Sequence, residues 1–219
     1  MAKVAPSILA ADFANMGRDV GKLHAWGASL VHCDVMDGFF VPNISFGSQL
    51  IRAIKPLTPL PLDVHLMITQ PERYVEEFVQ AGADILTVHQ EVTPHLHRVL
   101  ALIRDCGAKT GVKTGVALNP STHISTIEYV LDMIDLVLIM TCDPGYGGQQ
   151  LIPAMIDKVA AMKRMVERSG FDIEIEVDGG VCEKNAAALV KAGVDILVAG
   201  TAVFDAGDPQ QVVHDLLNA

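Results

Sequence analysis

Short apolar runs alternate with amphipathic stretches along the whole chain of 219 residues. The first two apolar runs, Val4 to Leu9 and Leu30 to Met36, flank a helix-like stretch that Asp12 can cap and that extends to about Ala25. The alternation repeats eight times with short connections. Strict alternation requires a parallel sheet covered by helices, and eight units most simply close into a barrel. We therefore predict an α/β fold of the (β/α)8 TIM-barrel type, with a doubly wound open sheet as the alternative.

The later elements follow the same order. We predict strands at 62–67, 85–89, 115–118, 136–140, 174–178 and 196–199, and helices at 48–55, 71–81, 94–106, 124–131, 153–169, 183–192 and 209–217. Gly82 and Gly193 each precede a predicted strand, as helix C-cap glycines do. No Pro/Gly/Ser-rich stretch or charge run marks a linker, so residues 1–219 are expected to form one barrel domain.

Composition narrows the range of partners. The net charge is −10 with no basic cluster, so nucleic acid and anionic membranes are not expected as partners. No apolar run reaches the length of a membrane span and no signal-peptide pattern is present, so we expect a soluble, cytoplasmic protein. The cysteines, at positions 33, 106, 142 and 182, contain no C-x-x-C spacing, which argues against a disulfide framework and a thiolate zinc site.

Ionisable residues end several of the predicted strands. His32 and Asp34 share one face of their strand, because side chains two apart point the same way. His65 and Asp178 lie near the ends of two further strands. Two imidazoles and two carboxylates at one barrel end suit Zn²⁺ or another borderline divalent ion. A polar group satisfied by its neighbours is the alternative, and Glu176 is expected to be a buried carboxylate whose partner the sequence does not identify.

Glycine-rich turns follow the last three predicted strands. They comprise Gly145-Tyr146-Gly147-Gly148, Gly179-Gly180 and Gly200-Thr201. Each turn exposes backbone N–H groups that no side chain covers, and one such turn alone indicates only a tight turn. Three at adjacent strands match the usual phosphate position of a barrel, which removes the need for Lys or Arg. Met36, Met67 and Met140 also end strands, either as core residues or as a roof over the site.

A direct repeat occupies residues 109–116, where Lys-Thr-Gly-Val occurs twice. Only one copy is needed to enter the fifth strand. We expect the other copy to lengthen the helix-to-strand connection, which lies on the face opposite a barrel's active site.

The sequence closely resembles the ribulose-phosphate 3-epimerase family from end to end. The matching motifs are Ala5-Pro6-Ser7-Ile8-Leu9, Asp34-Val35-Met36-Asp37-Gly38, Phe40-Val41-Pro42-Asn43, Asp63-Val64-His65-Leu66-Met67, Asp143-Pro144-Gly145-Tyr146-Gly147-Gly148-Gln149, Glu176-Val177-Asp178-Gly179-Gly180 and Ala199-Gly200-Thr201. This resemblance implies a metal-dependent isomerase that interconverts D-ribulose 5-phosphate and D-xylulose 5-phosphate in the pentose phosphate pathway. One divalent ion (Zn, Fe, Mn or Co) is implied as cofactor, and a homo-oligomer is expected.

The resemblance also assigns roles to residues. It implies that His32, Asp34, His65 and Asp178 bind the metal, that Asp34 and Asp178 are the proton acceptor and donor, and that Ser7 and His65 contact substrate. His89 becomes a satisfied polar neighbour rather than a ligand. Phosphate would bind at Gly145, Tyr146, Gly147, Gly148, Gly179, Gly180, Gly200 and Thr201, under a lid formed by Met36, Met67 and Met140.

Two departures from the family pattern concern the rim. Phe39 stands where the family often has His, and Tyr146 where Phe is usual. Two rival functions stay open. A related epimerase that acts on D-allulose 6-phosphate tends to lose a glycine in the turns after strands six and seven, whereas both turns are intact here. A catalytically silent sugar-phosphate-binding barrel would lose a ligand or a base, and all four are present.

Overall fold

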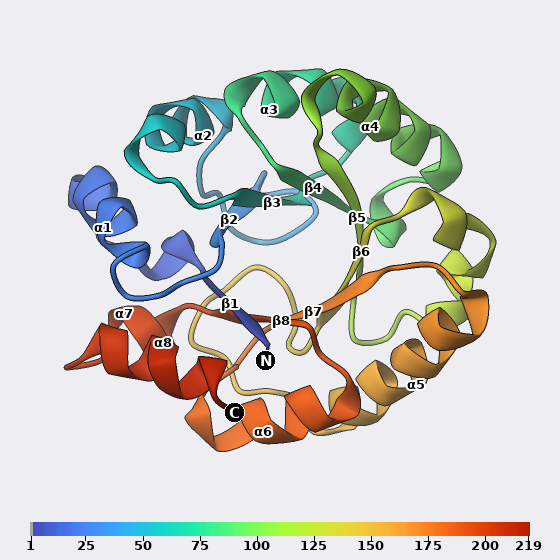
Figure 1. Ribbon diagram of the computed structural model, residues 1–219. Helices are drawn as coiled ribbons and strands as arrows, with labels where there is room; N and C mark the ends of the chain where they lie inside the picture. Colours follow the sequence, from blue (N-terminus) through green and yellow to red (C-terminus); the bar gives the residue numbers. More distant parts are fainter. Residues whose placement is uncertain (1) are drawn as a thin grey trace.

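Eight parallel strands form the core of the computed structural model, which describes residues 2–219 (Figure 1). The strands are β1 (Lys3–Pro6), β2 (Val31–Met36), β3 (Leu62–Met67), β4 (Ile85–His89), β5 (Lys113–Leu118), β6 (Leu136–Met140), β7 (Glu174–Asp178) and β8 (Ile196–Ala199). From β2 to β8 each strand pairs with the next in sequence, and β1 pairs with β8. At the remaining seam between β1 and β2, Ser7 forms a parallel bridge with His32. The predicted barrel is confirmed.

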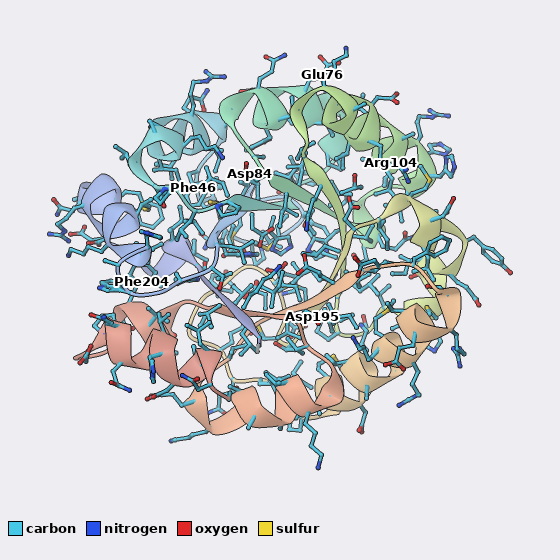
Figure 2. All side chains as sticks on the ribbon, in the orientation of Figure 1. Phe46, Glu76, Asp84, Arg104, Asp195 and Phe204 are labelled. Atoms are coloured by element: carbon cyan, nitrogen blue, oxygen red, sulfur yellow. The ribbon has the colours of Figure 1, made fainter. Side chains whose placement is uncertain are left out.

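Helices surround this ring of strands (Figure 1). They are α1 (Met16–Leu23), α2 (Ser48–Ile54), α3 (Val75–Ala81), α4 (Leu96–Thr110), α5 (Ala154–Ser169), α6 (Glu183–Ala192), α7 (Thr201–Phe204) and α8 (Pro209–Leu217). Side chains fill both the ring and the layer between ring and helices (Figure 2). None of the helices in residues 2–219 combines the length and apolarity needed to cross a membrane.

Alternate strand residues divide into two sets, as the two-residue period of a strand requires. One set packs beneath the helices in a large apolar cluster that includes Val4, Val64 and Leu197. The other set forms a separate cluster with Ala5, Ala117 and Leu138 among its members. Because the polar residues His32, Asp34 and His65 alternate with members of the first set, they belong to the interior of the barrel.

Aspartates organise the amino-terminal end of the barrel. Asp84 and Asp195, both labelled in Figure 2, immediately precede β4 and β8. Their Oδ2 atoms accept hydrogen bonds from the backbone N–H groups of Leu62 (2.7 Å) and Ile175 (2.9 Å) on the preceding strands. Asp135 does the same for Thr114 at 2.8 Å. These carboxylates accept hydrogen bonds from backbone N–H groups at the starts of the strands, so this end of the barrel contributes to stability.

Several predicted boundaries need correction. The strand predicted over 4–9 ends at Pro6, because the Ser7 hydroxyl accepts the backbone N–H of Leu9 at 3.3 Å and begins a short 3₁₀ helix at Ile8–Ala10. The stretch predicted as an α-helix over 124–131 is a 3₁₀ helix, Ile124–Met133. Its β-branched and hydroxyl residues disfavour the α-helix. The first helix ends at Leu23 rather than near Ala25, and the short helix α7 was not predicted.

The repeat at 109–116 is divided between two elements. Its first copy forms the last turn of α4 and the cap, where Gly111 adopts φ 83° and donates to the carbonyl of Gly107 at 2.7 Å. The second copy begins β5 at Lys113. The repeat lies at the amino-terminal end of β5, as expected. The extra copy lengthens the helix rather than the connection, because only Gly111 and Val112 join the two elements.

Deletion of residues 110–113 is expected to lower stability and to leave turnover largely intact. The deletion removes the C-cap and Val112, which is only 7% exposed. Burial of a valine contributes about 1.5–3 kcal/mol, which corresponds to a fall in Tm of roughly 3–12 °C for a chain of this size. Thermal unfolding and activity of the folded fraction test this. A variant that keeps its Tm yet loses turnover would contradict the placement of the repeat away from the site.

Candidate active site

Three strands bring the four predicted ligands together. His32 and Asp34 come from β2, His65 from β3 and Asp178 from β7. Asp34 pairs in register with His65. One nitrogen or oxygen atom from each of the four side chains lies within 4.8 Å of the corresponding atoms of the others. Both imidazoles are fully buried, whereas the Asp178 side chain is 19% exposed.

Asp34 lies at the centre of this cluster. Its Oδ1 is 3.2 Å from Nε2 of His32 and 3.1 Å from Nδ1 of His65. Its Oδ2 accepts a hydrogen bond of 2.5 Å from the Ser7 hydroxyl. Oδ2 of Asp178 is 4.0 Å from the same Nδ1 of His65. Two imidazole nitrogens and two carboxylates that face one point are a donor set suited to a borderline divalent metal, so this cluster could hold one.

A second carboxylate layer lies behind His32. Nδ1 of His32 is 2.6 Å from Oδ2 of Asp63 and 3.1 Å from Oε1 of Glu176. Nδ1 of His32 forms its hydrogen bond with Oδ2 of Asp63. Oδ1 of Asp63 and both oxygens of Glu176 have no hydrogen-bond partner among the described residues. A histidine that donates one ring N–H to a carboxylate presents the lone pair of its other nitrogen to a metal. Asp63 therefore orients Nε2 of His32 toward the cluster. The same Nδ1 of His32 is the neighbour of Glu176 that the sequence did not identify.

Charges and burial shift the pKa values of these groups in opposite directions. Burial lowers the pKa of His32, but the charges of Asp34 and Asp63 outweigh it and raise that pKa well above its ordinary value. Burial lowers the pKa of His65 to about 4. Burial would raise the pKa of Asp34, yet the two histidines hold it far below its ordinary value. Burial and the charge of Asp34 raise the pKa of Asp178 to about 7. The two carboxyls thus differ in proton affinity, as an acid and a base should.

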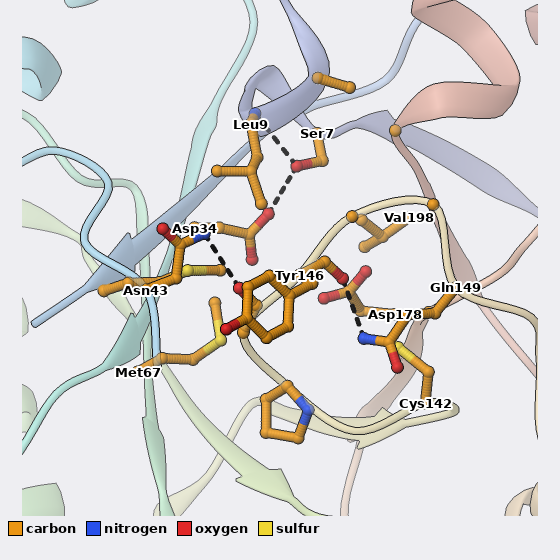
Figure 3. Close-up of a pocket in the computed structure, with 18 of the residues that line it drawn as sticks. Ser7, Leu9, Asp34, Asn43, Met67, Cys142, Tyr146, Gln149, Asp178 and Val198 are labelled. Atoms are coloured by element: carbon orange, nitrogen blue, oxygen red, sulfur yellow. Dashed lines mark hydrogen bonds between the residues drawn. The ribbon is translucent and has the colours of Figure 1, made fainter. Parts of the chain in front are cut away.

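A pocket of about 490 Å³ opens above the cluster (Figure 3). Figure 3 shows Ser7 beside Asp34, with Asp178 across the pocket from them. His32 and His65 lie beneath the pocket rather than in its wall. The predicted site residues in the wall are Ser7, Asp34, Met36, Met67, Met140, Gly145, Tyr146, Gly147, Gly148, Asp178, Gly179, Gly180, Gly200 and Thr201. No Lys or Arg is among the residues that line it.

Gly179 and Gly180 are required by both the backbone conformation and the packing. Gly179 and Gly180 adopt φ values of 125° and 67°, in the left-handed region. A Cβ on Gly179 would lie 2.6 Å from the backbone nitrogen of Cys142, and one on Gly180 would lie 2.3 Å from that of Leu151. Gly200 differs, because a Cβ there meets no atom closer than 3.5 Å. Packing leaves room for a side chain at Gly200, so its bare backbone keeps the pocket wall open.

Loops after β2 and β6 meet over the pocket. The Asn43 amide donates to the carbonyl of Gly145 and the Tyr146 hydroxyl donates to that of Pro42, both at 3.0 Å. The Gln149 amide donates to the carbonyl of Asp143 at 2.6 Å within the β6 loop. Asn43 and Gln149 both lie within the motifs that resemble the family, but their sequence positions predicted no role for them. Phe39 is 85% exposed and lies outside the wall of this pocket.

The fold and the site together define a (β/α)8-barrel protein with a buried His/Asp cluster that could hold a metal ion, beneath a pocket rimmed by glycine-containing turns. Comparison with known proteins makes the assignment more specific. The chain belongs to the ribulose-phosphate 3 epimerase family, whose model matches residues 3–204.

Curated relatives match over almost the whole chain. "Ribulose-phosphate 3-epimerase" of Bacillus subtilis is 49% identical over 217 residues, which cover 99% of this chain and 98% of the relative. The chloroplastic "Ribulose-5-phosphate-3-epimerase" of Arabidopsis thaliana is 50% identical over 215 residues, 97% of this chain and 75% of that protein.

Solved structures share the fold at low identity. A 3-hexulose-6-phosphate synthase aligns with a TM-score of 0.67 at 19% identity, covering 98% of this chain and 97% of that one. A tryptophan synthase alpha-subunit from Pyrococcus furiosus gives 0.72 at 14% identity, with coverages of 99% and 98%. At this identity the likeness confirms the barrel alone.

Proposed function

We propose that this chain interconverts D-ribulose 5-phosphate and D-xylulose 5-phosphate by inversion at C3. The observation that carries the proposal is the cluster of His32, Asp34, His65 and Asp178 beneath a pocket with an amide-lined rim. The curated relatives, which carry the name of this activity, support it. Purified protein given D-ribulose 5-phosphate should accumulate D-xylulose 5-phosphate to an equilibrium mixture. No conversion by metal-loaded, folded protein would refute the proposal.

Inversion of a carbon beside a ketone needs proton removal from one face and proton return on the other. Asp34 and Asp178 lie on separate strands, β2 and β7, so each can serve one face without moving across the substrate. One of the two accepts the C3 proton to give an enediolate, and the other donates a proton from the opposite side. The Ser7 hydroxyl donates to Oδ2 of Asp34, and Ser7 lines the pocket, where it can contact the substrate.

His32, Asp34, His65 and Asp178 are proposed to hold one divalent ion, Zn, Fe, Mn or Co. When bound, such an ion supplies a positive charge beside the substrate oxygens, which stabilises the enediolate and acidifies the C3 proton. The residues present fit this role, since the lone pairs of both histidines and the oxygens of both aspartates face one point. Part of the pocket wall is apolar and excludes water from the reacting carbon; it is formed by Met36, Met67 and Met140.

The rim is proposed to bind the phosphate through backbone N–H groups of Gly147, Gly148, Gly179, Gly180 and the Gly200-Thr201 pair. Tyr146 and Gly145 shape the same loop. Replacement of Gly200 by Val should fill the space beside this rim. Because a hydrogen bond to a charged group contributes about 1.5–3 kcal/mol, KM should rise by ~10-fold or more, with metal content unchanged.

Gly207→Val is the matched control for this substitution, because a Cβ at Gly207 meets nothing within 4 Å and Gly207 lies outside the pocket wall. Steady-state kinetics and metal analysis compare the two variants. Equal KM values for Gly200→Val, Gly207→Val and the parent protein would argue against phosphate binding at this rim. Gly179 is a poorer target, because a side chain there collides with backbone.

D-Allulose 6-phosphate is the rival substrate. Both glycine turns that the related epimerase tends to alter are intact here, which favours the pentulose. The ratio of kcat/KM for the two substrates decides between them.

We further propose that residues 1–219 act as one domain, that the protein assembles as a homo-oligomer, and that it resides in the cytoplasm. Its four free cysteines agree with a reducing compartment.

A further inference from the structure

A polar chain leads from the metal cluster to the rim beyond β4. Nε2 of His65 is 2.8 Å from Nε2 of His89, and Nδ1 of His89 is 3.0 Å from Oε2 of Glu91. The two imidazoles stack with ring centroids 4.9 Å apart and an interplanar angle of 27°. His89 is fully buried, and Phe40 covers it at a centroid distance of 4.8 Å. His89 therefore has only His65 and Glu91 as ring-nitrogen partners among the described residues.

Glu91 is held firmly as a carboxylate acceptor. Its Oε1 accepts the backbone N–H of Asn119 at 2.8 Å and the hydroxyl of Thr122. These bonds and the contact with His89 lower the pKa of Glu91 to about 2, although burial opposes them. Its Oε2 faces His89 alone, so the ring nitrogen opposite must carry a hydrogen.

The order of donors along the chain then follows. With its hydrogen on Nδ1, neutral His89 has a lone pair on Nε2 and must accept from His65. His65 consequently carries its hydrogen on Nε2, which leaves the lone pair of Nδ1 directed at Asp34 and the metal cluster. This is the tautomer that a metal ligand needs. The Glu91 carboxylate, separated from His65 by His89 alone, thus determines which nitrogen of His65 is free.

We propose that Glu91 is a positioning residue that, through His89, fixes the metal-binding tautomer of His65. This inference deepens the proposed function and rests on its metal site. It gives His89 a positioning role, although His89 is not itself a metal ligand. It also explains why two stacked imidazoles are buried beside the site. Asp63 performs the same task for His32 by a single direct hydrogen bond.

Glu91→Gln tests this directly, because the amide reverses the order of donors without a change in shape. The fixed N–H of Asn119 requires the amide oxygen, so the amide NH₂ faces Nδ1 of His89. His89 must then carry its hydrogen on Nε2, and His65 is driven to place its own on Nδ1, in the ligand position. Loss of an orienting partner of this kind weakens metal binding by ~10–100-fold.

Two control variants separate this role from simple loop anchoring. Thr122→Val removes one hydrogen bond from Glu91 but keeps the carboxylate opposite His89, so metal affinity should stay near that of the parent. Glu174→Gln makes the same chemical change at the amino-terminal end of β7, where Glu174 pairs with Lys3 and Lys113, and should also leave the affinity unchanged. If Thr122→Val weakened metal binding as much as Glu91→Gln, the role of Glu91 would be structural and the inference would fail.

The measurements are the Zn²⁺ dissociation constant of each protein, from competition with a chromophoric chelator, and the ¹⁵N NMR tautomer of His89 in the zinc-loaded parent. We expect weaker binding only in Glu91→Gln and the His89 hydrogen on Nδ1. Unchanged affinity in Glu91→Gln, or a His89 hydrogen on Nε2 in the parent, would overturn the inference alone. A parent protein that binds no divalent ion would overturn the proposed function as well.

Discussion

Asp34→Asn and Asp178→Asn are each expected to lose epimerisation by ~10² to 10⁴-fold, the range typical of general acid–base groups. The two carboxylates lie on β2 and β7 and face the same pocket. Each amide variant keeps one carboxylate that can still exchange the C3 proton of one epimer with solvent. The variants should therefore wash deuterium into opposite epimers without inversion.

The metal content of each variant must be measured together with its rates, because both aspartates belong to the proposed ligand set. Asp63→Asn is a useful comparison, since Asp63 contacts His32 but does not line the pocket. It should reduce metal affinity while the exchange pattern of the remaining enzyme stays that of the parent. If both metal-loaded Asp34 and Asp178 variants exchange the same epimer, a single mobile base becomes the better account.

Removal of the metal by a chelator is expected to abolish turnover and to lower stability. Without an ion, the negative charges of Asp34 and Asp178 repel one another in this cluster, and burial together with the charge of Asp34 raises the pKa of Asp178. An ion present at 100 times its Kd stabilises the folded state by about 2.7 kcal/mol, equivalent to roughly 5–11 °C in Tm.

Addition of Zn²⁺, Fe²⁺, Mn²⁺ or Co²⁺ to the stripped protein should restore both Tm and activity with at least one of the ions. A parallel sample that passes through the same dialysis without chelator controls for loss of folded protein. Full activity of protein shown by elemental analysis to be metal-free would rule out the proposed cofactor.

Much of the fold could be predicted because its signals are local. The spacing of apolar runs fixes eight strands, and Gly82 and Gly193 end helices in the left-handed conformation, both with φ 110°. The errors occur where a side chain competes with the backbone pattern. The Ser7 hydroxyl ends β1 earlier than its apolar sequence suggests, and the Lys-Thr-Gly-Val repeat can be read equally as helix end or strand start.

The candidate site was predictable to the extent that its residues recur two apart on one strand face. His32 and Asp34 show this pattern, and so do Asp63 with His65 and Glu176 with Asp178. The contacts between strands were not predictable, since the pairing of His32 with Asp63 and of His65 with His89 depends on barrel register and side-chain rotamers. Likewise, Asn43 and Tyr146 meet partners about a hundred residues away, which no local pattern indicates.

Deuterium incorporation at C3 tests the central claim most directly. Metal-loaded protein in D₂O with D-ribulose 5-phosphate should yield D-xylulose 5-phosphate that carries one deuterium, located at C3, because the returned proton comes from a carboxyl group in exchange with solvent. The metal-free control is the chelated protein, which should give neither product nor label. Xylulose 5-phosphate formed with label at another carbon, or no conversion while D-allulose 6-phosphate is epimerised and labelled, would contradict the account.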